Sequence, residues 1–363
     1  METNDSNRTC EFYNRNHPFL LGGYIVIFVI GLILNSTSIF VFIYYFRMNT
    51  VVTIYMCNLA VSDLLFTLSL PFRMHYYANS AWSFGNVPCQ ISGSLFQINM
   101  YGSCLFLLCI NIDRFLAVVY PLRLRHLRRQ KVAHMVCLSV WIVIILFCAP
   151  VARMHKTTQC TYFGSGKNET LCFESFTDDS WKDNIIPLVI TAEILGFLLP
   201  LSVVTYCTTH TLVVLFKRRS EHSTRGIKTI RLLVVNMVIF VVCFVPYNTT
   251  LAIYSLLKSN GHSQLKSDTV RSVLFITIMM ASVNCVLDPL VYYFSTEGFR
   301  STFRNITVAQ KKVNNSTAQR VLWKGSNKKE IANESKISLN TCLQNMSVLQ
   351  KQPIEIINTE SVV

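Results

Sequence analysis

Five residues with oxygen-bearing side chains lie within long apolar stretches of the chain, at comparable positions along those stretches. They are Asn35, Asp63, Ser103, Asn284 and Asp288. Two carboxylates together with amide and hydroxyl oxygens are suitable ligands for a hard cation such as sodium. A water-filled hydrogen-bond network needs the same side chains. Both interpretations are open at this stage.

Basic residues near one end of several apolar stretches could bind a phosphate. They are Arg73, Arg153, His155, Lys258 and Arg271. Lysine and arginine pair with phosphate oxygens, and arginine can do so through two parallel hydrogen bonds. Alternatively, these side chains reach the membrane surface or pair with loop acids such as Glu174 and Asp179. Ligand contact is favoured most for Arg73, because an unpaired charge inside an apolar stretch is costly.

The elements that carry these residues must cross a membrane. Half of the residues, 51%, are apolar and only 14% are charged. Seven stretches are long enough to span about 30 Å of hydrocarbon, and backbone groups in that medium must be satisfied within a helix. We therefore expect an all-α bundle of seven transmembrane helices. The stretches run over Phe19 to Phe46, Val51 to His75, Pro88 to Ile112, Val132 to Ala152, Ile185 to Phe216, Leu232 to Leu257 and Ser272 to Phe294.

Loop charges predict the orientation, because short cytoplasmic loops are rich in lysine and arginine. The loops after the third and fifth stretches are basic, and the loop after the fourth is rich in acids. The N-terminus, residues 1–18, is then outside, residues 19–304 form the membrane domain, and residues 305–363 form a disordered cytoplasmic tail. We expect a plasma-membrane protein with glycosylation at Asn4, Asn7 and Asn168.

Several other functions are disfavoured by the sequence. The net charge of +14 is concentrated at membrane edges and in the tail, where it meets anionic lipid rather than nucleic acid. A transporter or channel would show internal repeats or a continuous lane of charges. An enzyme would need a nucleophile and base or paired metal ligands at one depth, and His134 and His210 are scattered. We therefore expect no catalytic residues, no cofactor and no metal beyond sodium.

The order of motifs resembles that of rhodopsin-like G-protein-coupled receptors. The motifs are Gly31-Leu-Ile-Leu-Asn35, Asn58-Leu-Ala-Val-Ser-Asp63, Asp113-Arg114-Phe115, Trp141, Pro200, Cys243-Phe-Val-Pro246 and Asp288-Pro-Leu-Val-Tyr292. The resemblance implies signalling to heterotrimeric G proteins, with Asp113, Arg114 and Tyr292 at the coupling end. Because the sixth stretch has no acid at its inner end, Asp113 is the expected resting partner of Arg114.

Longer runs resemble the lysophosphatidic acid receptors that group with the purinergic nucleotide receptors. One such run is Asn284-Cys-Val-Leu-Asp-Pro-Leu-Val-Tyr-Tyr-Phe294. A lysophospholipid agonist is implied, with Arg73, His155, Lys258 and Arg271 facing its phosphate. A nucleotide or another anionic ligand is the alternative. The acyl chain could contact apolar residues that otherwise simply pack the core, namely Phe96, Met100, Tyr101, Phe197, Phe244 and Tyr247.

The resemblance also implies a disulfide between Cys89 and Cys172. Among cysteines near the outer surface this leaves Cys10 and Cys160, for which we expect a second bridge. Two positions depart from the commonest receptor pattern, since Phe244 replaces a tryptophan and Thr208 a tyrosine. The details of switching therefore cannot be transferred from other receptors.

The cytoplasmic end carries two further patterns. Phe299 and Phe303 are four residues apart beside Arg300 and Arg304, which predicts a short amphipathic helix on the inner membrane face. The final residues, Thr359 to Val363, place a serine two positions before a terminal valine. Such an end can add as a strand to a PDZ domain, which captures its carboxylate.

Overall fold

The computed structural model describes residues 3–154, 157–161, 168–172, 186–217, 224–259 and 264–295. They belong to one compact unit, Met1–Arg300. The predicted helix around Phe299 and Phe303 and the cytoplasmic tail lie outside the described residues.

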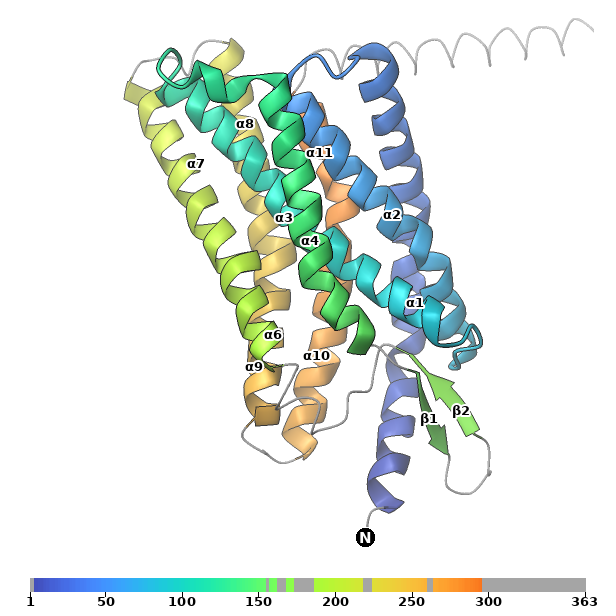
Figure 1. Ribbon diagram of the computed structural model, residues 1–363. Coiled ribbons are helices and arrows are strands. Elements are labelled where there is room, and N and C mark those ends of the chain that lie inside the picture. The colour runs from blue at the N-terminus through green and yellow to red at the C-terminus, as the bar shows by residue number, and fades with distance from the viewer. Residues whose placement is uncertain are drawn as a thin grey trace, which may run out of the picture. The chain divides into compact units, whose positions relative to one another are not determined.

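Within these residues, seven helical spans are long and apolar enough to cross a membrane, which confirms the predicted architecture (Figure 1). The spans are Pro18–Tyr45, Val51–Asn79, Asn86–Val119, Gln130–Arg153, Ile186–Lys217, Gly226–Lys258 and Thr269–Tyr292. Apolar side chains on their outer faces fit contact with lipid: Leu138 and Leu146 are 62% and 67% exposed.

Several spans combine more than one element. The elements are α1 (Thr3–Phe40), η1 (Val41–Tyr45), α2 (Val51–Asn79), α3 (Asn86–Val119), η2 (Arg125–Arg128), α4 (Gln130–Met154), α6 (Ile186–Thr191), η4 (Ala192–Leu198), α7 (Leu199–Lys217), α8 (Thr224–Ile239), η6 (Phe240–Phe244), α9 (Val245–Ser259), α10 (Gln264–Ser282) and α11 (Asn284–Ser295). Three of them, η1, η4 and η6, are π-helical, and η2 is a 3₁₀ turn.

Two prolines explain where π-helical turns interrupt the fifth and sixth spans. Proline has no N–H, and its ring collides with the carbonyl four residues earlier. Pro200 and Pro246 each follow a π-turn by two residues. In both turns the residue before the proline donates its N–H five residues back, from Leu199 to Ile194 and from Val245 to the carbonyl of Phe240. The wider turn accommodates the carbonyl that the proline cannot satisfy.

Close packing joins α2, α3 and α4. A Cβ atom added at Gly102 of α3 would lie 2.8 Å from the Ser62 hydroxyl of α2, so a glycine is needed for this approach. The indole N–H of Trp141 in α4 donates to the Asn58 side-chain oxygen of α2 at 2.9 Å, and its ring lies 5.9 Å from that of Phe106 in α3. These contacts hold α4 against α2 and α3, the two helices that carry Asp63 and Ser103.

The loop between the fourth and fifth spans contains a hairpin that the sequence analysis did not predict. Strands β1 (Thr158–Thr161) and β2 (Asn168–Leu171) pair antiparallel, with Thr158 opposite Leu171. The hairpin lies at the end of the bundle where the N-terminus is marked, beside α1 (Figure 1). The Trp82 N–H donates to the Thr170 carbonyl at 2.7 Å and connects the hairpin to the loop after α2.

Candidate functional site

A buried cation lies on α2 in the region predicted to bind ligand. The Arg73 residue is only 5% exposed. Its guanidinium carbon lies 5.5 Å from the centre of the Phe96 ring and 6.0 Å from that of Tyr24. The Tyr24 ring stacks in turn on Tyr77 at 5.6 Å. Aromatic faces attract a cation, so rings from α1 and α3 hold the Arg73 head group inside the bundle.

The other predicted phosphate ligands have different settings. Lys258 lies in the last turn of α9 and Arg271 in α10, and both are partly buried. These two helices pack against each other, with the buried Tyr254 beside Val270 and Leu274. Arg153 is exposed near the end of α4, which fits a side chain that reaches the membrane surface. His155 lies outside the described residues.

The residues predicted to contact the acyl chain differ in their surroundings. The Phe96 ring lies 5.6 Å from that of Tyr247, edge to face, so these two continue inward from Arg73. Phe244 is fully buried and packs on Phe240 at 5.3 Å within the π-turn of the sixth span. Met100 and Phe197 are buried, and Tyr101 is partly buried.

The mid-bundle polar residues satisfy part of the backbone. Pro289 cannot donate to the carbonyl of Cys285, four positions earlier. The Asn35 amide of α1 donates to that carbonyl at 2.8 Å and to the Gly31 carbonyl at 3.0 Å. The chain turns at Val283 between α10 and α11. Asn35 therefore joins the first span to the broken seventh span.

The remaining members of this network lie together between α2, α3 and α11. The Asn284 amide donates to the Ser103 hydroxyl at 2.8 Å. The Asp63 carboxylate accepts from Asn99 at 2.8 Å, and the Asp288 carboxyl group lies close to the Asp63 carboxyl group and to the Ser103 hydroxyl. Asn99 was not among the residues predicted from the sequence. Its spacing of four residues from Ser103 on one helix could have identified it.

Several buried oxygens in this network have no hydrogen-bond donor in good geometry within the described part of the chain, although the Ser103 hydroxyl lies near the Asp288 carboxyl group. They are Asn35 Oδ1, Asp63 Oδ2, Asn284 Oδ1 and both carboxylate oxygens of Asp288. Two neighbouring carboxylates repel each other unless a proton or a cation lies between them. Oxygen ligands without donors suit a hard cation, so these residues fit sodium.

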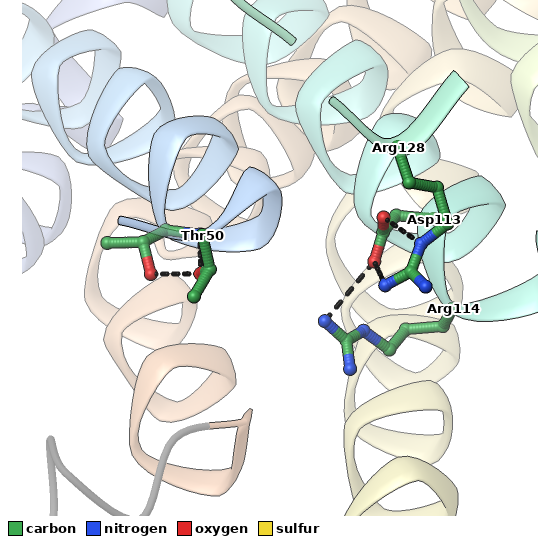
Figure 2. Close-up of polar contacts among 5 residues, drawn as sticks. Thr50, Asp113, Arg114 and Arg128 are labelled. Atoms are coloured by element: carbon green, nitrogen blue, oxygen red, sulfur yellow. Dashed lines mark hydrogen bonds and ion pairs between the residues drawn. The ribbon is translucent and has the colours of Figure 1, made fainter. Parts of the chain in front are cut away.

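The inner end of α3 carries an acid shared by two arginines (Figure 2). The Asp113 carboxylate is 3.2 Å from Arg114 NH2, which confirms the expected pairing of the two side chains. It also accepts from Arg128 of η2, at 2.8 Å from Nε and 3.4 Å from NH2. The Asp113 side chain is 3% exposed, against 26% for Arg114 and 30% for Arg128. Arg128 was not recognised from the sequence, because its contact crosses a loop.

Two further contacts organise the inner end. Thr50 caps α2 by accepting from the Thr53 N–H at 3.2 Å, and the two hydroxyls lie 2.6 Å apart (Figure 2). Tyr292, which the resemblance placed at the coupling end, is fully buried on α11. Its ring lies 5.1 Å from that of Phe42, edge to face. Tyr292 therefore packs against the first span.

Thr208, which stands where many receptors of this kind have a tyrosine, makes a hydrogen bond to the third span. The Thr208 hydroxyl donates to the Asn111 side-chain oxygen at 3.4 Å and connects α7 to α3. Asn111 itself donates to the Leu107 carbonyl at 2.8 Å. The Thr208 and Asn111 side chains therefore form a direct polar link between α7 and α3.

One of the two predicted disulfides is confirmed. Cys89 at the start of α3 bonds to Cys172, which follows β2, with Cα atoms 5.9 Å apart. The bridge ties the hairpin to the start of α3. The side chains of Cys10 and Cys160, and of the predicted glycosylation sites Asn4, Asn7 and Asn168, lie outside the described part of the structure.

Comparison with known proteins matches residues 34–292 to the family described as 7 transmembrane receptor (rhodopsin family). Lysophosphatidic acid receptor 5 of Mus musculus is 52% identical over 308 residues, covering 84% of this chain and 82% of that protein. Lysophosphatidic acid receptor 5 of Bos taurus is 48% identical over 312 residues, covering 84% of each. Lysophosphatidic acid receptor 4 of Homo sapiens is 39% identical over 303 residues, covering 82% and 80%.

Proposed function

This chain belongs to the rhodopsin family of seven-transmembrane receptors, and on that premise we propose that its agonist is lysophosphatidic acid or a closely related lysophospholipid. Membership makes the chain a receptor and not an enzyme. The relatives named for lysophosphatidic acid support the ligand class. The single observation that carries the proposal is Arg73, a cation 5% exposed inside an apolar bundle and flanked by aromatic rings.

The phosphate binds at the outer end of the bundle. Arg73 supplies the central charge, and Lys258 and Arg271 on the adjacent helices α9 and α10 add positive potential. His155 and Arg153 contribute at the rim. The acyl chain lies against apolar side chains such as Phe96 and Tyr247. A phosphate that enters this region exchanges water for charged donors, which are the strongest hydrogen-bond partners in proteins.

The sixth span transmits the effect of agonist binding to the inner face of the bundle. Its π-turn carries the buried Phe244, so a ligand that displaces Tyr247 alters the packing of Phe244 against Phe240. The inner end of the span then moves and uncovers Arg114 for a heterotrimeric G protein. A sodium ion held by Asp63, Asp288, Ser103, Asn35 and Asn284 would supply positive charge that stabilises the resting packing.

The receptor lies in the plasma membrane with its N-terminus outside and its C-terminus in the cytoplasm. The basic loops that follow the third and fifth spans support this orientation. At the far end, Ser361 and Val363 fit a PDZ scaffold. A peptide of the last ten residues should bind PDZ domains, and the same peptide with an amidated C-terminus should not, since the carboxylate is lost. Equal binding of both peptides would exclude carboxylate capture.

The ligand class is tested with a panel of lysophospholipids and nucleotides on cells that express the receptor. Lysophosphatidic acid should activate it and nucleotides should not. Arg73→Ala should lower the potency of lysophosphatidic acid about tenfold or more, because a charged hydrogen bond is removed, and Arg153→Ala, at the exposed rim, should have a smaller effect. Activation by nucleotides alone, or unchanged potency of Arg73→Ala at normal surface level, would contradict the proposal.

A further inference from the structure

Glu193 is an acid in the fifth span that belongs neither to the mid-bundle network nor to the cationic cluster around Arg73. It lies in the π-turn Ala192–Leu198 and is partly buried. Its Oε1 atom is buried and has no hydrogen-bond partner in the described part of the chain. An acid within an apolar span is costly, and most such acids have a functional reason to be there.

The Glu193 side chain belongs to the inward face of the turn. Bonding from residue i to i+5 places residues four apart close to one face, which Glu193 shares with the buried Phe197. The neighbouring Gly196 packs directly on α3, since a Cβ there would lie 2.7 Å from Cε1 of the Tyr101 ring. The carboxyl group lies within electrostatic range of the hydroxyl groups of Tyr101 and Tyr247.

Glu193 and Arg73 have Tyr247 as a common neighbour, since both charged groups lie within electrostatic range of its hydroxyl group. The Tyr247 ring lies 5.6 Å from that of Phe96, and the Phe96 ring lies 5.5 Å from the Arg73 guanidinium. A ligand bound at Arg73 beside these rings therefore lies in the same region as the Glu193 carboxyl group. The acid repels a phosphate and attracts a hydroxyl donor.

We infer that Glu193 accepts a hydrogen bond from the free hydroxyl group of the ligand's glycerol backbone. The inference rests on the proposed function, because it takes a phosphate at Arg73 as given. In lysophosphatidic acid the hydroxyl is only a few bonds from the phosphate, whereas a simple alkyl phosphate has no such group. Glu193 therefore sets the orientation of the ligand and selects for a glycerol backbone.

A double-mutant cycle isolates this contact. The ligands are lysophosphatidic acid and its analogue in which hydrogen replaces the glycerol hydroxyl. The receptors are the unmodified chain and Glu193→Met, which matches the length of the acid without its charge. The unmodified receptor should prefer the hydroxyl ligand about tenfold, as expected for a hydrogen bond to a charged group. Glu193→Met should respond to both ligands equally.

Two further variants keep the result interpretable. Thr191→Val is the control, because the exposed Thr191 hydroxyl bonds to the Pro187 carbonyl of its own helix, and its preference should be unchanged. Glu193→Gln keeps the shape but loses the charge, so the preference should fall even if Glu193→Met fails to reach the cell surface. An equal preference in the unmodified receptor and in the Glu193 variants would overturn the inference.

Failure of the inference can be told apart from failure of the proposed function. If the unmodified receptor responds equally to both lipids, the phosphate site stands and the hydroxyl contact is wrong. If it responds to neither lipid, the proposed ligand class is wrong and the hydroxyl contact is overturned with it.

Discussion

At the inner end of α3, Asp113 divides its charge between Arg114 and Arg128. The contact with Arg128 is the more complete, since two of its nitrogens approach the carboxylate and only one of Arg114 does. Both arginines are partly exposed, so solvent screens the pairs and each contributes modestly, about 0 to 1 kcal/mol. The resting state at this end therefore depends on a balance between two weak pairs.

The first prediction follows from this balance. Asp113→Asn should raise basal signalling about two- to fivefold, because Arg114 loses its charged partner. Arg128→Ala should instead lower basal signalling, because Asp113 then pairs with Arg114 alone and holds it more strongly. Basal nucleotide exchange on a G protein, normalised to surface receptor, measures both effects. Equal and unchanged basal rates would show that Asp113 does not restrain Arg114.

The mid-bundle carboxylates yield the second prediction. If sodium lies between Asp63 and Asp288 in the resting state, added sodium should lower agonist affinity about fivefold or more, a typical size for coupling between sites. Asp63→Asn should abolish the dependence, and potassium serves as the ionic-strength control. An affinity that responds equally to sodium and potassium would favour a network of water molecules.

Residues that stand out within their own segment could be predicted from the sequence. Contacts between segments that a loop separates could not. Asn35, Asp63 and Asp288 are recognisable because polar groups are rare in apolar stretches. The pairing of Asp113 with the adjacent Arg114 is equally local. Arg128, fifteen residues from Asp113, is one of several basic residues in its loop, and only the fold brings it to the carboxylate.

At the scale of elements, the spans follow from hydropathy but their irregular turns do not. Length and apolarity are properties of a segment, so all seven spans could be predicted. A proline predicts a disturbed helix. The formation of the π-turns η4 and η6 depends also on how the neighbouring helices pack against them. The β1–β2 hairpin forms from a loop of mixed polarity, where no periodic pattern distinguishes a strand.

The third prediction concerns the contact between η4 and α3. In Gly196→Ala the new methyl group meets two ring carbons of Tyr101 at 2.7 and 2.8 Å, so the ring or the π-turn must move. Overpacking of this kind costs about 1 to 3 kcal/mol. The variant should lose thermal stability and agonist potency together.

Gly22→Ala is the matched control, because an added Cβ at Gly22 meets nothing within 4 Å. It should resemble the unmodified receptor in both thermal unfolding and agonist dose-response. If Gly196→Ala behaves like Gly22→Ala, the close approach of Tyr101 to the fifth span is not important for the fold or the site.

At the scale of the membrane domain, the residues proposed for ligand binding and those proposed for coupling lie at opposite ends of the bundle. Arg73 and the disulfide between Cys89 and Cys172 belong to one end, and Asp113, Arg114 and Arg128 to the other. The basic loops predict that the second end faces the cytoplasm. This separation allows ligand binding and coupling to be disrupted independently.

The fourth prediction tests the orientation that this division requires. Antibodies should detect an epitope tag at the N-terminus on intact cells, and should detect a C-terminal tag only after the membrane is permeabilised. Glycosidase treatment should shift the mobility of the receptor, and combined substitution of Asn4, Asn7 and Asn168 should abolish the shift. Detection of the C-terminal tag on intact cells would reverse the assigned topology.

The central claim is that a lysophospholipid bound at the outer end activates a G protein at the inner end. Its most direct test uses purified receptor in lipid nanodiscs with a purified heterotrimeric G protein, measuring nucleotide exchange. Lysophosphatidic acid should accelerate exchange by the unmodified receptor. Arg114→Ala should still bind the lipid but give no acceleration, and Arg73→Ala should require about tenfold more lipid. Exchange that is indifferent to lysophosphatidic acid, or that is driven equally well through Arg114→Ala, would contradict the claim.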